Sequence, residues 1–196
     1  MLPHFEPVLG ERVWEWTKAL LALQQGYSSN GRMVGMSTEG TLFTIHGPLL
    51  GQASVCEPIL RALPQWFGME AALRHYVAEI EALPTLLAAV GGRFVGFLSL
   101  KQHYVSAAEI YVMGIEPAFR RQGIGRALLQ QAEAHLQRQG IEYLQVKTLS
   151  DSRADPNYAQ TRAFYHAVGF TPLEEIIAIW GEQNPCLIII KYLPPL

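Results

Sequence analysis

From about Leu42 onward, the chain alternates between apolar runs of strand length and amphipathic segments with a helical period. The run AAEIYVMGI (107–115) is typical of a strand and ends just before a proline. The clearest helical segment spans residues 123–140, where apolar residues recur on one face and Gly140 provides a C-terminal stop. The apolar residues of that face are Ile124, Leu128, Ala132 and Leu136.

The order of these segments predicts the fold class. The predicted elements are a strand at 42–47, helices at 53–67 and 69–83, strands at 85–90, 93–100 and 107–115, a helix at 123–140, a strand at 141–149, a short helix at 161–170, and strands at 172–180 and 186–193. Gly91-Gly92 and GEQNP (181–185) have the composition of turns. We therefore expect an α/β (α+β) fold with a mixed, mostly antiparallel central sheet of about seven strands and helices on both faces.

The first forty residues differ from the rest of the chain. The segment ERVWEWTKALLALQQG (11–26) predicts a short amphipathic helix, and the Gly- and Ser-rich segment that follows predicts a linker. We therefore divide the chain into an N-terminal extension, 1–40, and a main domain, 41–196. The apolar stripe of the extension could dock on the main domain or on a second copy of the chain, which would form a homodimer.

Composition excludes several classes of function. Half of the residues are apolar, and the formal net charge of -2 argues against nucleic acid as a partner. No apolar run approaches the roughly 20 residues that span a membrane, and the N-terminus has no secretory signal pattern. The two cysteines, Cys56 and Cys186, predict reduced thiols in a cytoplasmic protein. The six histidines are scattered, so we predict no metal site.

The stretch RRQGIGRALL (120–129) gathers three arginines around two glycines where a helix is expected to begin. A helix N-terminus exposes unpaired backbone N–H groups, so it binds anions readily. Glycines let a phosphate approach the backbone without meeting a Cβ atom, and arginines add charge-assisted hydrogen bonds. The stretch therefore predicts a cradle for a pyrophosphate.

Other interpretations of the stretch remain open on spacing alone. A nucleoside triphosphate site would need Lys followed by Ser or Thr after the second glycine, where this chain has Arg126-Ala127. A dinucleotide site would need a third glycine where Leu128 stands, and an acid at the end of the next strand, whereas Glu142 lies at its start. The plainest alternative is a helix that begins at a glycine and carries solvated arginines.

A resemblance to a known family favours the cradle. Arg120-x-x-Gly123-x-Gly125 resembles the acetyl-CoA pyrophosphate motif of the GNAT superfamily of N-acetyltransferases. Ile115-x-Pro117 is similar to the strand exit of that family, and FYHAVGF (164–170) is similar to its late helix-and-glycine signature. The resemblance runs from roughly Leu42 to Leu193. It implies the GNAT fold, acetyl-CoA as co-substrate without a metal, and a small-molecule or protein amine as acceptor.

The resemblance also implies which residues contact the cofactor. The backbone of Met113, Gly114 and Ile115 would pair with the pantetheine arm like an added strand. The pyrophosphate would be held by the stretch that comprises Arg120, Arg121, Gln122, Gly123, Ile124, Gly125 and Arg126. Family members often have Asn seven residues before the tyrosine of the late helix. Here that position is Tyr158, and the neighbouring Asn157 becomes the candidate contact.

Two residues match the catalytic positions of the family. Glu109 lies six residues before Ile115, as does the general-base glutamate of the histone-acetyltransferase branch. Tyr165 matches the tyrosine that faces the sulfur and is the candidate general acid. The alternatives are a solvated strand-end glutamate, a core aromatic residue, and His103 or His166 as proton carriers.

The acceptor would lie against the two early helices, and Trp66, Phe67 and Tyr76 are the candidate substrate-binding residues, unless they belong to the core. The leading hypothesis is an acetyl-CoA-dependent N-acetyltransferase. One alternative is an acyl-CoA sensor without catalysis. Another is a transferase for a longer acyl-CoA, since Gly114 and the splay of the sheet could leave room for a larger group.

Overall fold

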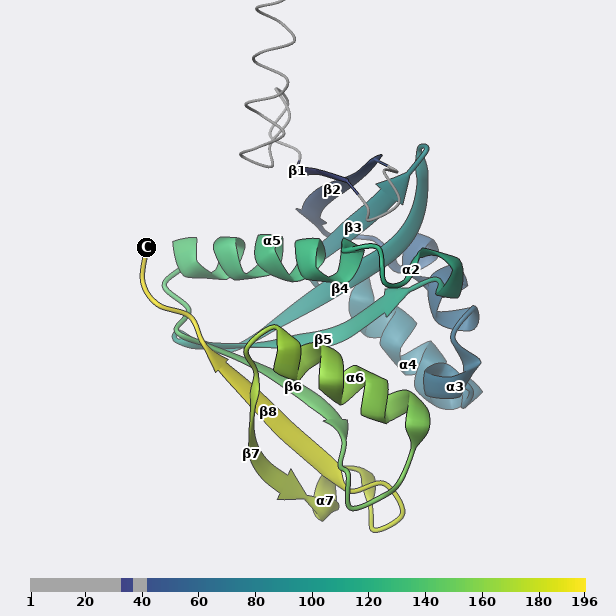
Figure 1. Cartoon of the computed structure of the whole chain (residues 1–196), viewed down its shortest axis with the longest axis vertical. Coiled ribbons are helices and arrows are strands. Elements are labelled where there is room, and N and C mark those ends of the chain that lie inside the picture. The colour runs from purple at the N-terminus through teal and green to yellow at the C-terminus, as the bar shows by residue number, and fades with distance from the viewer. Residues whose placement is uncertain (1–32, 37–41) are drawn as a thin grey trace, which may run out of the picture.

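The computed structural model describes residues 33–36 and 42–196. Its centre is one eight-stranded sheet with the strand order β1-β2-β3-β4-β5-β6-β8-β7 (Figure 1). The strands are β1 Met33–Met36, β2 Leu42–Leu49, β3 Thr85–Val90, β4 Arg93–Tyr104, β5 Ala107–Ile115, β6 Tyr143–Leu149, β7 Thr171–Ile176 and β8 Cys186–Tyr192. Neighbouring strands are antiparallel except β5 and β6, which are parallel.

Helices cover both faces of the sheet. Helices α5 (Ile124–Arg138) and α6 (Pro156–Ala167) pack on one face, whereas α2 (Ala53–Arg61) and α4 (Glu70–Ile80) pack on the other (Figure 1). The remaining helical turns are α3 Pro64–Phe67, η1 Pro117–Phe119 and α7 Ile177–Trp180. The predicted α/β fold class is confirmed, with eight strands in the described chain. No helix in the described ranges is long and apolar enough to cross a membrane.

The structure changes the predicted boundary before residue 41. Met33–Met36 forms β1 and pairs with β2, so the prediction of a linker is wrong for these residues. Gly35 is needed there because a Cβ atom would overlap the ring of Phe43 on the neighbouring strand. The predicted helix at 11–26 lies outside the described residues.

Helix α6 and strand β7 also differ from the sequence predictions, as does the predicted helix 53–67, which is divided into α2 and α3. Helix α6 begins at Pro156, several residues before the predicted start, because the Asp155 carboxylate accepts hydrogen bonds from the amides of Asn157 and Tyr158 at 2.8 and 3.0 Å. A capping Asp followed by Pro at the first helical position is a recognisable start signal. The predicted strand at 172–180 ends at Ile176 and continues as the turn α7.

The parallel pair at the centre of the sheet is short. Strands β5 and β6 pair only from Ala107↔Tyr143 to Glu109↔Gln145, although β5 continues to Ile115 and β6 to Leu149. The two strands diverge beyond these pairs, as Figure 1 shows on either side of α6. The second half of β5 therefore pairs with β4 alone and leaves its other edge free.

Helix α5 anchors the larger hydrophobic core. Its buried residues face β2, β3, β4 and β5, and Leu128 is completely buried among them. The helix ends at Arg138, and Gly140 just beyond it has a positive φ of 77° that suits the turn into β6. This packing fixes the position of the α5 N-terminus relative to the free edge of β5.

We predict that Leu128→Ala lowers the free energy of unfolding by about 2–5 kcal/mol, because it removes buried contacts and leaves a cavity. Urea denaturation followed by circular dichroism would measure the change. The matched control is Gln130→Ala on the exposed face of the same helix, which should change stability by less than about 0.5 kcal/mol. Equal effects of the two substitutions would contradict this account of the core.

Candidate active site

The free edge of β5 leads directly to the N-terminus of α5. After Ile115 the chain makes the short turn η1 and then a loop in which Arg121 and Gly123 have positive φ angles of 63° and 83°. Non-glycine residues rarely adopt such angles, and they cluster at functional sites. The left-handed residues bend the loop around the first turn of α5, where backbone N–H groups lack partners within the helix. This loop could therefore hold an anion.

The two glycines of the loop have different physical roles. A Cβ atom on Gly123 would point into open space, so a ligand can reach this part of the backbone. A Cβ atom on Gly125 would instead lie 3.2 Å from side-chain atoms of Met113 and Ile115, because Gly125 is buried against β5. Gly125 thus allows α5 to pack closely on β5. A ligand contact through its amide stays a prediction.

The arginines of the loop also separate into two groups. The side chain of Arg120 is half-buried: its Nε donates to the carbonyl oxygen of Ile115 at 3.2 Å, and its guanidinium lies 4.5 Å from the ring centroid of Trp66. Burial lowers the pKa of Arg120. Arg121 and Arg126 are exposed, and Gln122 donates to the carbonyl oxygen of Ala118. Arg121 and Arg126 are therefore the cations available to an incoming anion.

Trp66 lies at this loop and not with the other predicted acceptor residues. Besides stacking on Arg120, it donates its indole N–H to the hydroxyl of Thr161 on α6 at 3.2 Å. Short helix α3 is thereby joined both to the glycine–arginine loop and to α6. The predicted role of Trp66 as a residue of the acceptor pocket gains no support from these contacts.

Tyr165 is buried on α6 beside the free half of β5. Its hydroxyl lies 3.9 Å from the sulfur of Met113, and its ring packs between those of Phe164 and Phe170. Burial raises the pKa of Tyr165, so the phenol stays protonated at neutral pH. The structure therefore brings together Tyr165, Met113 and the start of α5, three parts of the sequence-predicted site.

Glu109 is buried, in contrast to the alternative of a solvated strand-end glutamate. It points to the face of the sheet that carries α4, and its carboxylate binds the Lys147 ammonium at 2.8 and 3.0 Å. The same carboxylate lies 2.7 Å from Nε2 of His103 and 3.5 Å from the amide nitrogen of Gln145. We call Glu109, Lys147 and His103 the carboxylate cluster.

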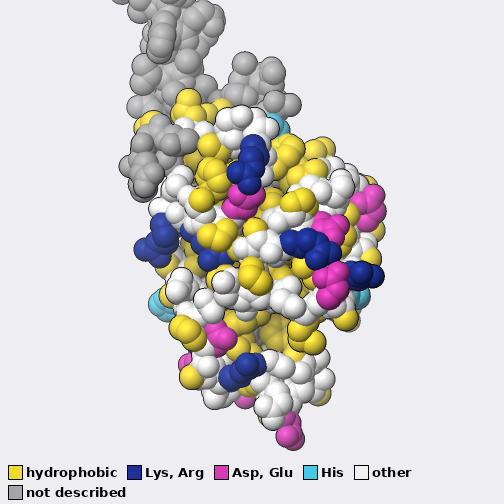
Figure 2. Space-filling view, turned by 90° about the vertical axis from the view of Figure 1, so that its right-hand side faces the viewer, with side chains coloured by type: hydrophobic (Ala, Val, Ile, Leu, Met, Phe, Trp, Pro, Cys, Tyr) yellow, Lys and Arg dark blue, Asp and Glu magenta, His cyan; other side chains and the backbone are white. Residues whose placement is uncertain are grey.

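Aromatic side chains lie next to the carboxylate cluster. Phe67 and Tyr111 each make an edge-on contact with the Tyr76 ring, at centroid distances of 5.5 Å. Burial and the nearby charge of Glu109 raise the pKa of Tyr76. Phe67 and Tyr76 thus share one surface, whereas Tyr111 was missed by the sequence analysis. Figure 2 views this side of the molecule and shows hydrophobic side chains inside a hollow.

A β-bulge explains the orientation of Tyr111. Strand β4 pairs Ser99 with Val112 and Leu100 with Ile110, so Tyr111 is an extra residue on β5 without a partner. Bulges re-aim side chains and often lie next to active sites. Here the bulge turns Tyr111 toward Tyr76 of α4. The ammonium nitrogen of Lys101, on β4, lies 4.9 Å from the centroid of the Tyr111 ring.

The remaining predicted contacts lie around the diverging strands. Asn157 is in the first turn of α6 and is half-buried. Thr148, on the part of β6 that has left β5, has a buried hydroxyl without a partner among the described residues. A buried hydroxyl without a partner is unfavourable by about 1–3 kcal/mol. These polar groups, with the free edge of β5, suit an extended ligand that carries amide groups.

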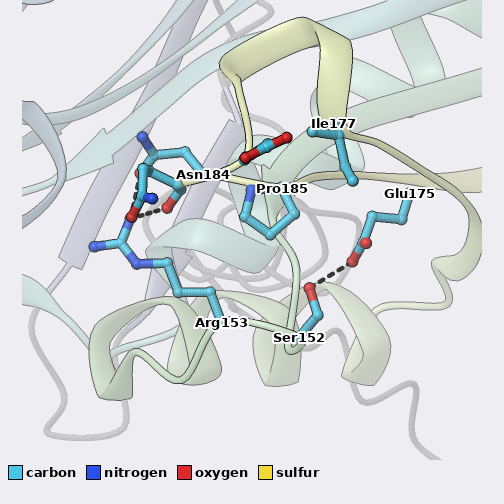
Figure 3. Close-up of a pocket in the computed structure, with 8 residues that line it drawn as sticks. Ser152, Arg153, Glu175, Ile177, Asn184 and Pro185 are labelled. Atoms are coloured by element: carbon cyan, nitrogen blue, oxygen red, sulfur yellow. Dashed lines mark hydrogen bonds between the residues drawn. The ribbon is translucent and has the colours of Figure 1, made fainter.

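A second hollow lies at the far end of β6 and β8, with a volume of about 510 Å³ (Figure 3). Its polar groups bind one another: Ser152 donates to Glu175 at 2.7 Å, and Arg153 donates to the Gln183 carbonyl oxygen and to Asn184. These bonds fasten the β6–α6 loop to β7 and to the turn before β8. The hollow is therefore a structural junction, separate from the glycine–arginine loop.

The sequence profile of the Acetyltransferase (GNAT) family matches residues 56–170, which is more than half of the chain. The chain belongs to the GNAT family. The match begins in α2 and ends after α6. It therefore includes the diverging strands β5 and β6, the glycine–arginine loop, the three residues of the carboxylate cluster, and Tyr165.

Other GNAT proteins resemble this one in part or throughout the fold. The mycothiol acetyltransferase of Beutenbergia cavernae is 30% identical over 82 residues, which are 42% of this chain and 26% of that protein. The match thus spans about a quarter of the length of that relative. A GNAT acetyltransferase structure from Desulfovibrio desulfuricans has a TM-score of 0.65 at 17% identity, and covers 78% of this chain and 99% of its own.

A GNAT structure with its ligand has the same fold. The PaiA N-acetyltransferase of Thermoplasma acidophilum, solved in complex with coenzyme A, has a TM-score of 0.59 at 18% identity, with 76% of this chain and 98% of that chain covered. At these identities the likeness shows a common fold. One protein with this fold is thus known in complex with coenzyme A.

We predict that Gly123→Val weakens coenzyme A binding at least tenfold, or about 1.4 kcal/mol, because the side chain would enter the space beside the α5 N-terminus. Isothermal titration calorimetry would measure the dissociation constant. Gly140→Val is a matched control: Gly140 has a similar φ of 77° and open space around its Cβ position, but lies at the opposite end of α5. Both variants carry a left-handed strain of about 1–2 kcal/mol. Equal coenzyme A affinity in the two variants would discard the site.

Proposed function

We propose that the protein is an acetyl-CoA-dependent N-acetyltransferase that transfers the acetyl group directly to a primary amine of a small molecule or protein. The observation that carries this proposal is the free edge of β5, which runs from Tyr165 to the glycine–arginine loop. Membership of the GNAT family supports the same reaction. The acceptor amine, a homodimer and a cytoplasmic location stay predictions from the sequence.

The proposed cofactor site extends along β5. The amides at the start of α5, together with Arg121 and Arg126, would hold the pyrophosphate. Arg120 would shape the loop from inside, since its Nε binds the Ile115 carbonyl oxygen. The backbone of Met113–Ile115 would pair with the pantetheine arm as an added strand would, and Asn157 in the first turn of α6 would be a further contact. When bound, acetyl-CoA supplies a thioester carbonyl as the electrophile.

The acceptor would approach from the opposite face of the sheet. Met113 and Tyr165 belong to the α5–α6 face, whereas Glu109, Tyr76 and Tyr111 lie on the α4 face. The two faces of the sheet would be connected where β5 and β6 diverge, beyond the pair Glu109↔Gln145. Aromatic walls beside a carboxylate suit an amine that carries a positive charge and an apolar body.

Removing the proton of the amine is the first chemical requirement. An amine with a pKa near 10.4 is neutral about once in 10³ molecules at pH 7, which corresponds to roughly 4–5 kcal/mol. A basic group on the acceptor side offsets part of this deficit. Glu109 is the general base that the sequence predicts. Its carboxylate is buried, and hydrogen bonds with His103 and Lys147 hold it in a defined position.

The leaving group is the second requirement. As the amine nitrogen bonds to the carbonyl carbon, the C–S bond breaks and the sulfur takes a proton. Tyr165 is suited to donate it, because burial raises the pKa of its hydroxyl and keeps the phenol protonated. Its ring is held on two sides by Phe164 and Phe170, which fixes the direction of the hydroxyl.

The alternative of a longer acyl group rests on Gly114 and on the splay of the sheet. The Gly114 position gives it little support, because a Cβ atom there would lie 3.1 Å from Phe97, 3.2 Å from Leu63 and 3.4 Å from Ile59. Neighbouring side chains therefore already occupy the space beside Gly114. Acetyl remains the acyl group that we propose.

We predict that wild-type protein releases coenzyme A thiol from acetyl-CoA in the presence of at least one class of primary amine. The panel would contain a diamine, an aminoglycoside, an N-terminal alanine peptide and a lysine-containing peptide, with thiol detected by a chromogenic reagent. Tight coenzyme A binding without thiol release for any amine would favour the sensor over the enzyme.

We predict that Tyr165→Phe lowers kcat at least tenfold while coenzyme A affinity changes less than threefold, because the ring and its packing survive. The deficit should persist as the pH rises, since the substitution removes an acid and not a base. Steady-state kinetics and calorimetry would measure both values. The control is Tyr143→Phe, at an exposed position at the start of β6. Loss of coenzyme A binding in Tyr165→Phe would make the hydroxyl a binding contact.

A further inference from the structure

The carboxylate cluster contains a second proton carrier that is more accessible than Glu109. The Glu109 side chain is 4% exposed, and its two oxygens already receive the Lys147 ammonium and the His103 ring. The His103 side chain is 32% exposed. Protonation of Glu109 would break at least one of its hydrogen bonds, whereas a proton can reach His103 from the solvent side.

A second bulge places His103 in this position. Strand β4 pairs Gln102 with Ala108 and Tyr104 with Ala107, so His103 is an extra residue without a partner on β5. The bulge directs the imidazole back over β5 to Glu109, six residues further along the chain. The extra residues of the two bulges, Tyr111 and His103, therefore both lie at the α4 face beside Glu109.

The contact with Glu109 favours one tautomer of the neutral ring. An ionised carboxylate only accepts hydrogen bonds, so Nε2 of His103 must carry the proton that Glu109 receives at 2.7 Å. In the neutral ring, Nδ1 then has a free lone pair and is the basic atom. An imidazole held by a carboxylate is an arrangement that orients the ring and stabilises the imidazolium.

We propose that His103, oriented by Glu109, is the base of the transfer reaction, and that Glu109 is its positioning residue. This inference rests on the proposed N-acetyltransferase function. The acceptor ammonium loses one proton to Nδ1 of His103 through a water molecule, and the nitrogen lone pair attacks the thioester carbonyl carbon. The C–S bond breaks and the sulfur takes the Tyr165 proton. The second N–H proton restores Tyr165 through solvent, and His103 releases its proton to solvent.

The other ionisable groups around the carboxylate cluster are paired or stay neutral near neutral pH. Lys147 of β6 neutralises Glu109. Lys101 of β4 is paired with Glu79 of α4 at 2.7 Å. Burial raises the pKa of Cys186 on β8 to about 11 and that of Tyr111 to about 12, and burial also raises the pKa of Tyr76 on α4. These thiol and phenol groups therefore stay neutral between pH 5 and 8, where a histidine ordinarily titrates.

The kinetic test compares His103→Gln with Glu109→Gln and with the exposed α4 control His75→Gln. It uses acetyl-CoA and the best amine of the panel, with kcat/KM measured from pH 5.5 to 9.5. His103→Gln should lose about 10²-fold near pH 7, and the deficit should shrink as the amine deprotonates at high pH. Glu109→Gln should lose activity with the same pH trend, and His75→Gln should match wild type.

Two further measurements separate catalysis from folding. Free imidazole should restore part of the activity of His103→Ala, since the site is open to solvent, but none of the activity of Tyr165→Phe. Long-range ¹H–¹⁵N NMR of the full chain, with His103 assigned from its loss in His103→Gln, should show the neutral ring protonated at Nε2. A ring protonated at Nδ1 would overturn the proposal.

The outcomes distinguish this inference from the function on which it rests. If His103→Gln keeps wild-type kcat/KM while Glu109→Gln loses it, Glu109 takes the proton itself and the role of His103 is refuted, but the N-acetyltransferase stands. If the wild-type protein releases no thiol with any amine of the panel, the proposed function falls and the role of His103 falls with it.

Discussion

The parting of β5 and β6 is the constraint on which the rest of the structure depends. Two parallel strands in the middle of a sheet would ordinarily pair along their whole length, since buried backbone N–H and C=O groups need partners. Here the pairing stops at Glu109↔Gln145. Antiparallel partners on the outer sides, β4 and β8, hold the two strands in place while their facing edges separate. The sheet thus remains continuous and still contains an opening.

The opening makes the sheet a partition between two chemical environments. On one face, α5 presents its N-terminus and α6 presents Tyr165. On the other face, the two bulges turn Tyr111 and His103 toward α4 and the buried charge of Glu109. Groups suited to donate a proton and groups suited to accept one are therefore on opposite sides of the same two strands. This separation keeps them from neutralising one another directly.

Local patterns in the sequence were sufficient for the elements but not for their exact pairing. The period of α5 and the stop of this helix just before Gly140 depend on neighbouring residues, so the sequence predicts them correctly. The strand β1 was missed because it is short and glycine-containing, and Gly35 makes sense only against the Phe43 ring of β2. The bulges were missed because an extra residue is defined by the partner strand and leaves no mark on the alternation of a single strand.

The same distinction applies to the site. Tyr165 and the backbone of Met113–Ile115 are predicted from motifs, whereas the surroundings of Glu109 come from three strands and could not be read from any one of them. Lys147 lies 38 positions beyond Glu109 and looks like an ordinary strand lysine. Trp66 was grouped with Phe67 because they are adjacent in sequence, yet adjacent residues of a short helix point in different directions, and only Phe67 faces Tyr76.

Trp66 has a consequence for how the two ligands of a transferase would influence each other. One side of the indole rests on Arg120 of the glycine–arginine loop, and its N–H is bonded to α6, while its helix also carries Phe67 of the aromatic surface. A ligand that pulls Arg120 outward removes the support of α3, and so changes the wall that the other ligand meets. Thermodynamic linkage makes such an effect reciprocal. If the first ligand changes the binding free energy of the second, the second changes the binding free energy of the first by the same amount.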